Sequence, residues 1–285
     1  MIRYHVNPAR TQEPIDASPF HQYTLDDGSV WTEFYRLDGG YRLRFPGLAD
    51  FDVSADGKVA TAIPARDTDE VTVEHLYINQ VVPLALSRQG VPSFHASAVT
   101  VEGGTIAFLG GSGMGKSTLA ASFALSDAAF LTDDSLIIEE TVDGCFIQPS
   151  HASLRLWQDS VDALVQKEVS AAGAICYSNK ARLLAGDALH YAGAPERLLA
   201  AYVLAWNEPA ELEIEPLSGT ERHMAWIENS FLLDIKDKEL LARHFDWTHR
   251  VSGSVPTFSL DYPREYGILP EVRAAVTLHC KSIVR

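Results

Sequence analysis

The feature that most restricts how this chain can fold is a glycine-rich loop between an apolar strand and a helix. Residues 110–117 satisfy the pattern GxxxxGK[ST], after an apolar strand at 105–109 and before a helical pattern over 118–125. Glycines let successive backbone N–H groups turn toward phosphate oxygens, and the helix presents its positive end to the same anion. The sequence predicts a nucleotide-binding loop made of Gly110, Gly111, Ser112, Gly113, Met114, Gly115, Lys116, Ser117 and Thr118.

A pair of acidic residues at the end of the next apolar strand complements this loop. The strand expected at 128–131 leads into Asp133 and Asp134. In nucleotide-binding folds of this kind a strand-end carboxylate holds Mg²⁺ together with the hydroxyl of the loop, here Ser117. The other carboxylate can accept a proton from an attacking hydroxyl, or the pair can simply form an acidic turn. The residues alone leave open which aspartate takes which role.

Composition removes several classes of protein. The chain has 285 residues, with 23 Lys and Arg against 38 Asp and Glu, and a formal net charge of −15. Proteins that bind nucleic-acid backbones carry a positive face, so we expect no nucleic-acid partner. The cysteines Cys145, Cys176 and Cys280 match no zinc spacing and are expected to be reduced thiols. No signal peptide or long apolar stretch is visible, which predicts a cytoplasmic protein without a membrane partner.

The first third of the chain has the pattern of a small β-rich module. Short alternating segments at 30–35, 41–45 and 51–54 are separated by glycine turns and predict an antiparallel meander. A helical pattern then runs from residue 68 to 86, where Pro83 should kink or split the helix and Gly90 should end it. We therefore expect one module over residues 1–90 and a second domain over 91–285.

The remainder alternates strands and helices, which predicts an α/β fold: a sheet flanked by helices. Ser218 and Glu221 fit a capping box at the start of a helix. Further strands are expected at 97–101, 136–138, 154–157, 199–206, 212–217 and 255–260, and helices at 159–167, 218–229, 238–245 and 270–281.

The stretch from Phe94 to Asp134 resembles the core of the HPr kinase/phosphorylase family. It contains a histidine before a strand, a turn, a second strand, the glycine-rich loop, a helix and a strand that ends in Asp-Asp. The resemblance implies that Asp133 holds the metal with the loop hydroxyl. It also implies that Asp134 acts as the base toward an acceptor serine, and that His95 tunes or orients Asp134.

Outside this core the chain departs from HPr kinase proper. Thr118 stands where the bifunctional enzymes often carry Glu, and residues 154–160 occupy the place of their glycine-rich second signature. That block, the early meander and residues 255–264 look like a divergent branch, which includes kinases encoded beside lasso-peptide and related biosynthesis genes. The departures leave phosphorylase activity, and HPr itself as the acceptor, unsupported.

Three basic residues are candidates for completing a phosphate site. A transferring phosphoryl group needs positive charge beyond Lys116. Arg155 lies on the strand at 154–157, and Lys180 and Arg182 lie in a later polar connection. Each can contact phosphate or acceptor, or be an ordinary surface charge.

These observations favour an ATP-dependent, Mg²⁺-requiring, HPr-kinase-like phosphotransferase that acts on a hydroxyl, namely serine of a peptide or small protein. The predicted catalytic residues are Asp134, His95 and Lys116, with Ser117 and Asp133 on the metal. Two alternatives stay open: a nucleotide-binding regulatory module without transfer, and a small-molecule kinase on the same scaffold. An oligomer is compatible with the sequence. The expected fold is a P-loop, HPr-kinase-like sheet flanked by helices and preceded by the small β-rich module.

Overall fold

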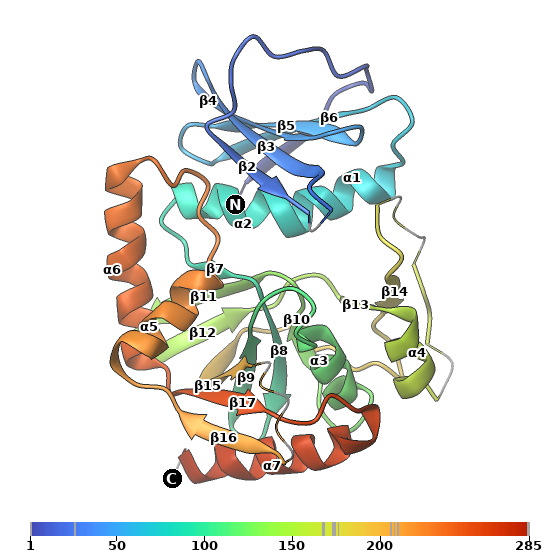
Figure 1. Cartoon of the computed structure of the whole chain (residues 1–285), viewed down its shortest axis with the longest axis vertical. Coiled ribbons are helices and arrows are strands. Elements are labelled where there is room, and N and C mark those ends of the chain that lie inside the picture. The colour runs from blue at the N-terminus through green and yellow to red at the C-terminus, as the bar shows by residue number, and fades with distance from the viewer. Residues whose placement is uncertain are drawn as a thin grey trace. The chain divides into compact units, whose positions relative to one another are not determined.

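The described part of the chain divides into two units (Figure 1). The computed structural model describes residues 2–25, 27–166, 169–172, 175, 177–205, 207, 209 and 211–283. Unit 1 comprises Met1–Val91, Ala174–Ser178 and Leu232–Leu240, and unit 2 comprises Pro92–Gly173, Asn179–Phe231 and Leu241–Arg285. Because two later segments belong to unit 1, the domain limits of 1–90 and 91–285 stay a prediction.

Unit 1 contains a six-stranded sheet in the order β1-β6-β5-β4-β3-β2. Its centre is the expected antiparallel meander, which is confirmed, and its alternating positions bury Phe34, Leu43, Phe45 and Phe51. The two edge strands were not predicted; β1 pairs with β6 in parallel and β2 pairs with β3 in antiparallel. The strands are β1 (Arg3–Val6), β2 (His21–Thr24), β3 (Val30–Leu37), β4 (Gly40–Phe45), β5 (Ala49–Ser54) and β6 (Val59–Pro64).

The helix that follows this sheet contains a π-helical turn just before Pro83. It runs as α1 (Glu70–Leu76), the π-turn η1 (Tyr77–Val81) and α2 (Val82–Arg88). Because Pro83 has no N–H to donate, it cannot continue the regular helical hydrogen bonds. The wider π-turn before it divides the helix there, which agrees with the predicted split. Gly90 ends the helix at φ 75°, with Val91 N–H donating to Leu86 O at 3.0 Å, which confirms the predicted stop.

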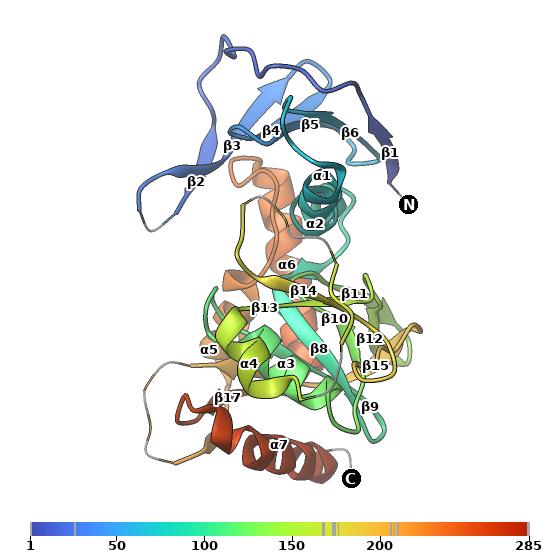
Figure 2. The same cartoon turned by 90° about the vertical axis from the view of Figure 1, so that its right-hand side faces the viewer.

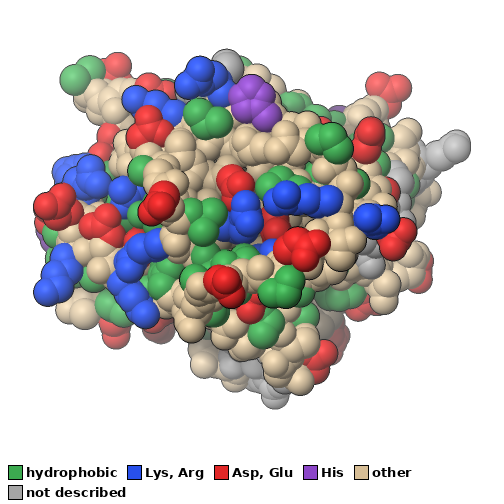
Figure 3. Space-filling model, turned by 90° about the horizontal axis from the view of Figure 1, so that it is seen from above, with side chains coloured by type: hydrophobic (Ala, Val, Ile, Leu, Met, Phe, Trp, Pro, Cys, Tyr) green, Lys and Arg blue, Asp and Glu red, His purple; other side chains and the backbone are tan. Residues whose placement is uncertain are grey.

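Four arginines of unit 1 are neutralised by carboxylates. Basic and acidic side chains are interspersed over the face of the molecule drawn in Figure 3. Pairing of this kind leaves little net positive potential for a polyanion. The pairs in unit 1 are Arg36–Asp234 at 2.7 Å, Arg42–Asp52 at 2.7 Å, Arg44–Asp50 at 2.8 Å and Arg88–Asp237 at 2.7 Å.

Unit 2 is built on a curled mixed sheet in the order β10-β8-β9-β15-β12-β11-β7, with β17 also paired to β15 and β16 paired to β17. Strands β9, β15 and β17 run parallel, and β8 forms an antiparallel hairpin with β9. The fold is therefore mixed α/β with a β-rich N-terminal sheet. The strands are β7 (Ser93–Phe94), β8 (Ala96–Val101), β9 (Gly104–Leu109), β10 (Phe130–Thr132), β11 (Leu136–Thr141), β12 (Gly144–Gln148), β15 (Glu196–Leu204), β16 (Glu213–Pro216) and β17 (Thr257–Asp261).

Alternation along the central strands sends side chains to two cores, one on each face of the sheet. Ile106 and Phe108 of β9 pack in the cluster that includes α3 and α7, whereas Leu109 packs with Trp226 and Trp247 of α5 and α6. Figure 2 shows α3 and α4 next to each other in front of β8. The helices are α3 (Lys116–Ala124), α4 (Gln158–Leu164), α5 (Gly219–Glu228), α6 (Lys238–Ser254) and α7 (Leu269–Ile283), with a 3₁₀ turn η2 (Tyr266–Ile268) before α7.

Several sequence predictions for unit 2 need correction. Ser218 caps α5 without a side-chain hydrogen bond, so the predicted capping box is wrong. The expected helix at 238–245 extends to Ser254. The predicted strand at 154–157 is β13 (Ser153–Leu156), which pairs with β14 (Ala181–Leu184) in a separate two-stranded sheet.

Some predicted features fall partly outside the described residues. The expected helix at 159–167 corresponds to α4, but Lys167 lies outside the described part. Trp206, the expected end of the strand at 199–206, and Cys176 lie outside it as well. Cys145 and Cys280 are buried free thiols. No helix among the described residues is long and apolar enough to cross a membrane.

Replacing Trp226 by Ala should lower the free energy of unfolding by about 3–5 kcal/mol. The side chain is fully buried, lies 4.7 Å from the Phe94 ring and donates from Nε1 to Thr257 Oγ1. Trp157→Ala is the matched control, because half of that side chain is already exposed. Urea unfolding followed by circular dichroism measures both. Equal losses in the two variants would contradict the packing described for this core.

Candidate active site

The glycine-rich loop follows β9 directly and ends in the first turn of α3. Gly110, Gly113 and Gly115 have φ values of 141°, 82° and 87°, which favour glycine. A Cβ on Gly110 would also lie only 3.2 Å from Leu204 O. Gly115 caps α3 without any side-chain hydrogen bond, so the N–H groups of the first turn keep their capacity to bind an anion.

Asn229, at the end of α5, anchors the start of this loop. Its Oδ1 accepts from Gly110 N–H at 2.9 Å, and its backbone oxygen accepts from His95 N–H at 2.6 Å. The amide Nδ2 donates to Ala225 O at 2.8 Å, which holds the side chain in place. One buried residue therefore ties the loop to the histidine before β8. Sequence reasoning missed Asn229, because nothing in its local pattern marks it.

Lys116 is buried under the loop that precedes it. Only 5% of the residue is exposed, and Nζ donates to Gly110 O at 2.7 Å and to Gly111 O at 2.9 Å. Burial lowers the pKa of Lys116 to about 8, although Asp134 and Asp133 act in the opposite direction. The ammonium group is thus held at the loop in a site where its charge is costly to desolvate.

Asp133 directly follows β10 and accepts hydrogen bonds from three other elements. Its carboxylate accepts from Ser97 Oγ at 2.6 Å, from Ser117 Oγ at 2.9 Å and from Arg155 N–H at 3.2 Å. The residue is 1% exposed, and burial, followed by the charge of Asp134, raises the pKa of Asp133 to about 6. The predicted contact between Asp133 and Ser117 is present. Ser97 is an additional partner that the sequence analysis did not identify.

Asp134 turns away from its neighbour through a left-handed backbone. Its φ of 66° is the only positive value at a non-glycine residue in the described ranges. Arg155 Nη1 lies 3.8 Å from Asp134 Oδ2. Burial alone would raise the pKa of this carboxyl, but His95, Lys180, Arg155 and Lys116 outweigh burial and lower the pKa below its usual value. The Asp134 carboxylate therefore stays ionised at neutral pH.

His95 lies against Asp134 and is half-buried. Its Nδ1 is 3.2 Å from Asp134 O, and the Phe231 ring meets it edge-on. Burial, then Lys116, lowers the pKa of His95, while Asp134 raises it. The ring is accordingly neutral near pH 7, which lets it accept or donate a hydrogen bond beside the carboxylate.

A pocket joins these groups. It is lined by His95, Ser112, Gly113, Gly115, Lys116, Ser117, Thr118, Asp134, Arg155, Leu156, Trp157 and Lys180. Lys180 Nζ lies 5.4 Å from the Trp157 ring centroid. Two of the three candidate cations, Arg155 and Lys180, therefore reach the loop. Arg182 does not line this pocket; its Nε donates to Ser153 Oγ at 3.1 Å on the neighbouring strand.

The segment after β17 supports the opposite side of the loop. Arg264 donates from Nη1 to Met114 O at 3.4 Å and from Nη2 to Ala205 O, and it lies over the Tyr262 ring at 4.2 Å. A Cβ on Gly115 would meet Arg264 Nη1 and Tyr262 OH at 3.9 Å. These residues lie far from the loop in sequence, and spacing gave no indication of their contact.

The chemistry of the donor set fits a magnesium nucleotide. Ser117 and Asp133 offer hard oxygen ligands side by side, which Mg²⁺ prefers. Phosphate oxygens could be bound by the N–H groups at the uncapped start of α3. Positive charge could come from Lys116, Arg155 and Lys180. The described residues contain no cluster of three or more His, Cys, Asp or Glu side chains that would hold a metal by themselves. A Mg²⁺ ion here would share its coordination with phosphate.

Replacing Lys116 by Met should stabilise the ligand-free protein at pH 7 by about 1–3 kcal/mol. A buried lysine with a lowered pKa disfavours folding wherever the unfolded lysine is charged. The penalty is complete below pH 8 and fades between pH 8 and the ordinary value of 10.5. The gain should therefore shrink as the pH rises through this window, measured by urea unfolding at several pH values.

Lys281→Met is the control for this pH window. Its side chain is 47% exposed and paired with Glu102 at the surface, so we expect a change below about 0.5 kcal/mol and no such window. A Lys116→Met protein less stable than wild type at pH 7 would contradict the described desolvation.

Comparison with known proteins gives a distant likeness. No protein-family model matches the sequence, and no curated protein matches it either. Among solved structures, the HPr(Ser) kinase/phosphatase from Coxiella burnetii is similar with a TM-score of 0.35 and 8% identity. The alignment covers 67% of this chain and 97% of that chain. The likeness is one of fold alone.

Proposed function

We propose that this chain is an ATP-dependent, Mg²⁺-requiring kinase that transfers the γ-phosphate to a hydroxyl group. One observation carries the proposal. Three features meet at one site. They are the cation of the glycine-rich loop, a hydroxyl–carboxylate pair suited to Mg²⁺, and a second carboxylate that is ionised. Nucleotide binding alone requires the first two features, and transfer to a hydroxyl requires the third.

Phosphate oxygens would be bound by the loop and the first turn of α3. The N–H groups of that turn and Lys116 would hold the chain of phosphates, and Arg155 and Lys180, which line the same pocket, would add positive charge. Ser117 and Asp133 would hold Mg²⁺, which neutralises charge on the outer phosphates. Lys116 would exchange its present carbonyl partners, Gly110 O and Gly111 O, for phosphate oxygens.

Asp134 is the proposed base. It faces the pocket, whereas the carboxylate of Asp133 is occupied by three donors. The acceptor oxygen forms a bond to the γ-phosphorus, the bond from phosphorus to the β-phosphate oxygen breaks, and the acceptor proton passes to the Asp134 carboxylate. His95 is adjacent and neutral, and its Nδ1 lies 3.2 Å from the backbone oxygen of Asp134, so it would hold the residue that carries the base.

The proposed acceptor is a serine of a peptide or small protein. Its support is the resemblance of residues 94–134 to a family that phosphorylates serine, together with the different residues at 154–160 on the expected acceptor side. The net charge of −15 disfavours a large acidic partner. A flexible serine-bearing segment needs only one pocket and a few backbone contacts.

Replacing Asp134 by Asn should leave binding of magnesium nucleotide intact but lower phosphoryl transfer by about 10²–10⁴-fold. Asn adopts the left-handed conformation that φ 66° requires, so the backbone is preserved while the proton acceptor is lost. Asp133→Asn should instead raise the Mg²⁺ concentration needed for activity. Titration calorimetry and a transfer assay at graded Mg²⁺ separate the two effects.

Asp143→Asn serves as the control, because that residue is exposed in the turn between β11 and β12. Normal transfer by Asp134→Asn together with lost transfer in Asp133→Asn would show that the two roles are exchanged. Normal transfer by both variants would exclude this site as the catalytic centre.

Incubation of the protein with labelled Mg-ATP and a cell lysate should give phosphoserine on a peptide or small protein. A serine phosphate ester is stable in mild acid and labile in strong base, so mass spectrometry and these treatments identify it. Stoichiometric consumption of ATP with a free small-molecule alcohol, and no label on any protein or peptide, would contradict the serine assignment. The roles of the loop and of Asp134 would survive that result.

A further inference from the structure

The phosphate site fixes the orientation of a bound nucleotide, because the proposed reacting groups lie on one side of it. Asp134, His95 and Lys180 mark the side where the outer phosphate and the acceptor would meet. In such loops the lysine reaches the outer phosphates, while N–H groups of the loop and of the first turn of the helix hold the inner ones. The nucleoside must therefore leave the loop on the side away from Asp134.

Sheet topology places one chain segment on that other side. On one flank of β9 lie β8 and then β10, which Asp133 follows directly; on the other flank lie β15 and then β17. Strands β9, β15 and β17 are parallel, so their carboxyl ends reach the same edge of the sheet, where α/β folds bind ligands. The residues that emerge there after β17 are 262–266, and Arg264 already contacts the loop at Met114.

A row of hydroxyl groups connects this segment to the inner end of the phosphate site. Thr118, which lines the phosphate pocket, lies 3.1 Å from Ser160 by their Oγ1 and Oγ atoms. Ser160 Oγ in turn lies 3.1 Å from Tyr266 OH, and Tyr266 OH donates to Asp159 at 2.9 Å. Tyr266 is thus two hydrogen bonds from the first turn of α3.

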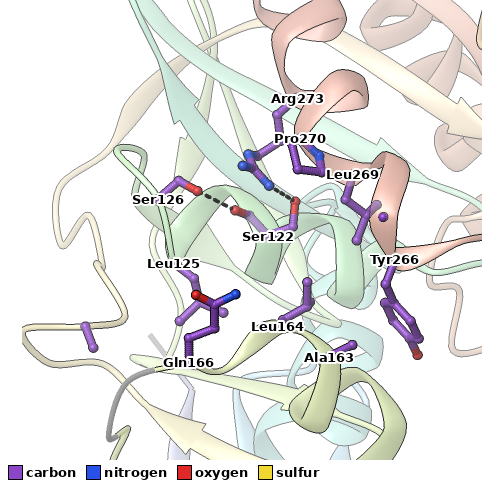
Figure 4. Close-up of a pocket in the computed structure, with 12 residues that line it drawn as sticks. Ser122, Leu125, Ser126, Ala163, Leu164, Gln166, Tyr266, Leu269, Pro270 and Arg273 are labelled. Carbon is purple, nitrogen blue, oxygen red and sulfur yellow. Dashed lines mark hydrogen bonds between the residues drawn. The ribbon is translucent and has the colours of Figure 1, made fainter.

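Tyr266 also forms one side of a second pocket, between α3, α4 and the start of α7 (Figure 4). The volume of this pocket is about 440 Å³, within the range of roughly 300–1,000 Å³ that small-molecule sites occupy. Its apolar wall includes Leu164 and Leu269. Ser122, which also lines it, is one helical turn after Thr118, a rise of ~6 Å along α3. This is within reach of a nucleoside attached at the inner phosphate.

Arg273 supplies a directed polar group in this pocket. Its Nη1 donates to Ser122 Oγ at 3.1 Å (Figure 4), and Asp127 is the carboxylate that acts on its charge. A guanidinium group can only donate hydrogen bonds, so it suits the ring-nitrogen acceptors of a heterocyclic base. An aromatic ring, an apolar wall and one fixed donor are what recognition of a planar base requires.

From these contacts we infer that the pocket bounded by Tyr266 and Arg273 binds the base of the nucleotide whose phosphates lie on the glycine-rich loop. The inference rests on the proposed function. It assigns a site to the nucleoside of ATP, for which the loop motif gives no position. Tyr266 packs against the base, and Arg273 donates to a ring nitrogen. The sugar of the nucleoside lies along residues 262–266, between the two pockets.

The test compares two ligands that share their phosphates. Titration calorimetry with Mg²⁺ measures the affinity of ATP and of inorganic tripolyphosphate for the full chain. ATP should bind wild-type protein about ten-fold or more tightly than tripolyphosphate, because stacking of one base contributes that much. Tyr266→Ala and Arg273→Met should each weaken ATP by about ten-fold and leave the affinity for tripolyphosphate unchanged.

Binding of tripolyphosphate also shows that a variant is folded. Tyr23→Ala, which changes an exposed tyrosine of unit 1, is the matched control and should alter neither affinity. Equal affinities of wild type for the two ligands would overturn the base site and keep the loop. Parallel weakening of both ligands in Arg273→Met would overturn it too, and that variant decides the case if Tyr266→Ala is unfolded. Failure of both ligands to bind wild type would overturn the proposed function and the base site with it.

Discussion

The burial of one carboxylate organises the candidate site in unit 2. Asp133 is almost fully removed from water, and such a charge is tolerated only when donors surround it. Its donors come from β8, from the first turn of α3 and from the backbone of β13. The carboxylate therefore fixes the distance between the glycine-rich loop and the strand that carries Arg155. The site forms only if three segments, separate in the sequence, pack around this residue.

The neighbouring aspartate shows the opposite balance of forces. Asp134 is only partly exposed, and Lys180, Arg155 and Lys116 keep it ionised. Three cations at one pocket are a notable concentration in a chain with 23 basic residues and a net charge of −15. In unit 1, by contrast, Arg42 and Arg44 are neutralised by carboxylates in local pairs. The cations of the pocket instead surround the place where phosphates are expected.

The sequence was most informative where function depends on neighbours in the chain. The loop at 110–117 and the Asp133–Asp134 pair are local patterns, and their backbone requirements are visible in single residues. Ser97 and Asn229 could not be found this way, because an isolated serine or asparagine has many structural uses and only the folded sheet brings them to the site. Arg182 illustrates the reverse case. Its neighbourhood suggested a phosphate ligand, but the pairing of β13 with β14 directs it to Ser153.

The parallel pairing of β9, β15 and β17 has a consequence for the order in which the protein is made. The loop after β9 is synthesised long before β17, which pairs with β15, the neighbour of β9. Arg264, which contacts Met114 of the loop, follows it by 150 residues. Contacts this distant in sequence form slowly and only after both ends exist. During translation the nascent chain therefore holds a loop without these contacts until β17 and Arg264 are made. Any affinity that the loop has for phosphate would in this sense be completed only after residue 264, and a chain terminated before that point would lack these supports.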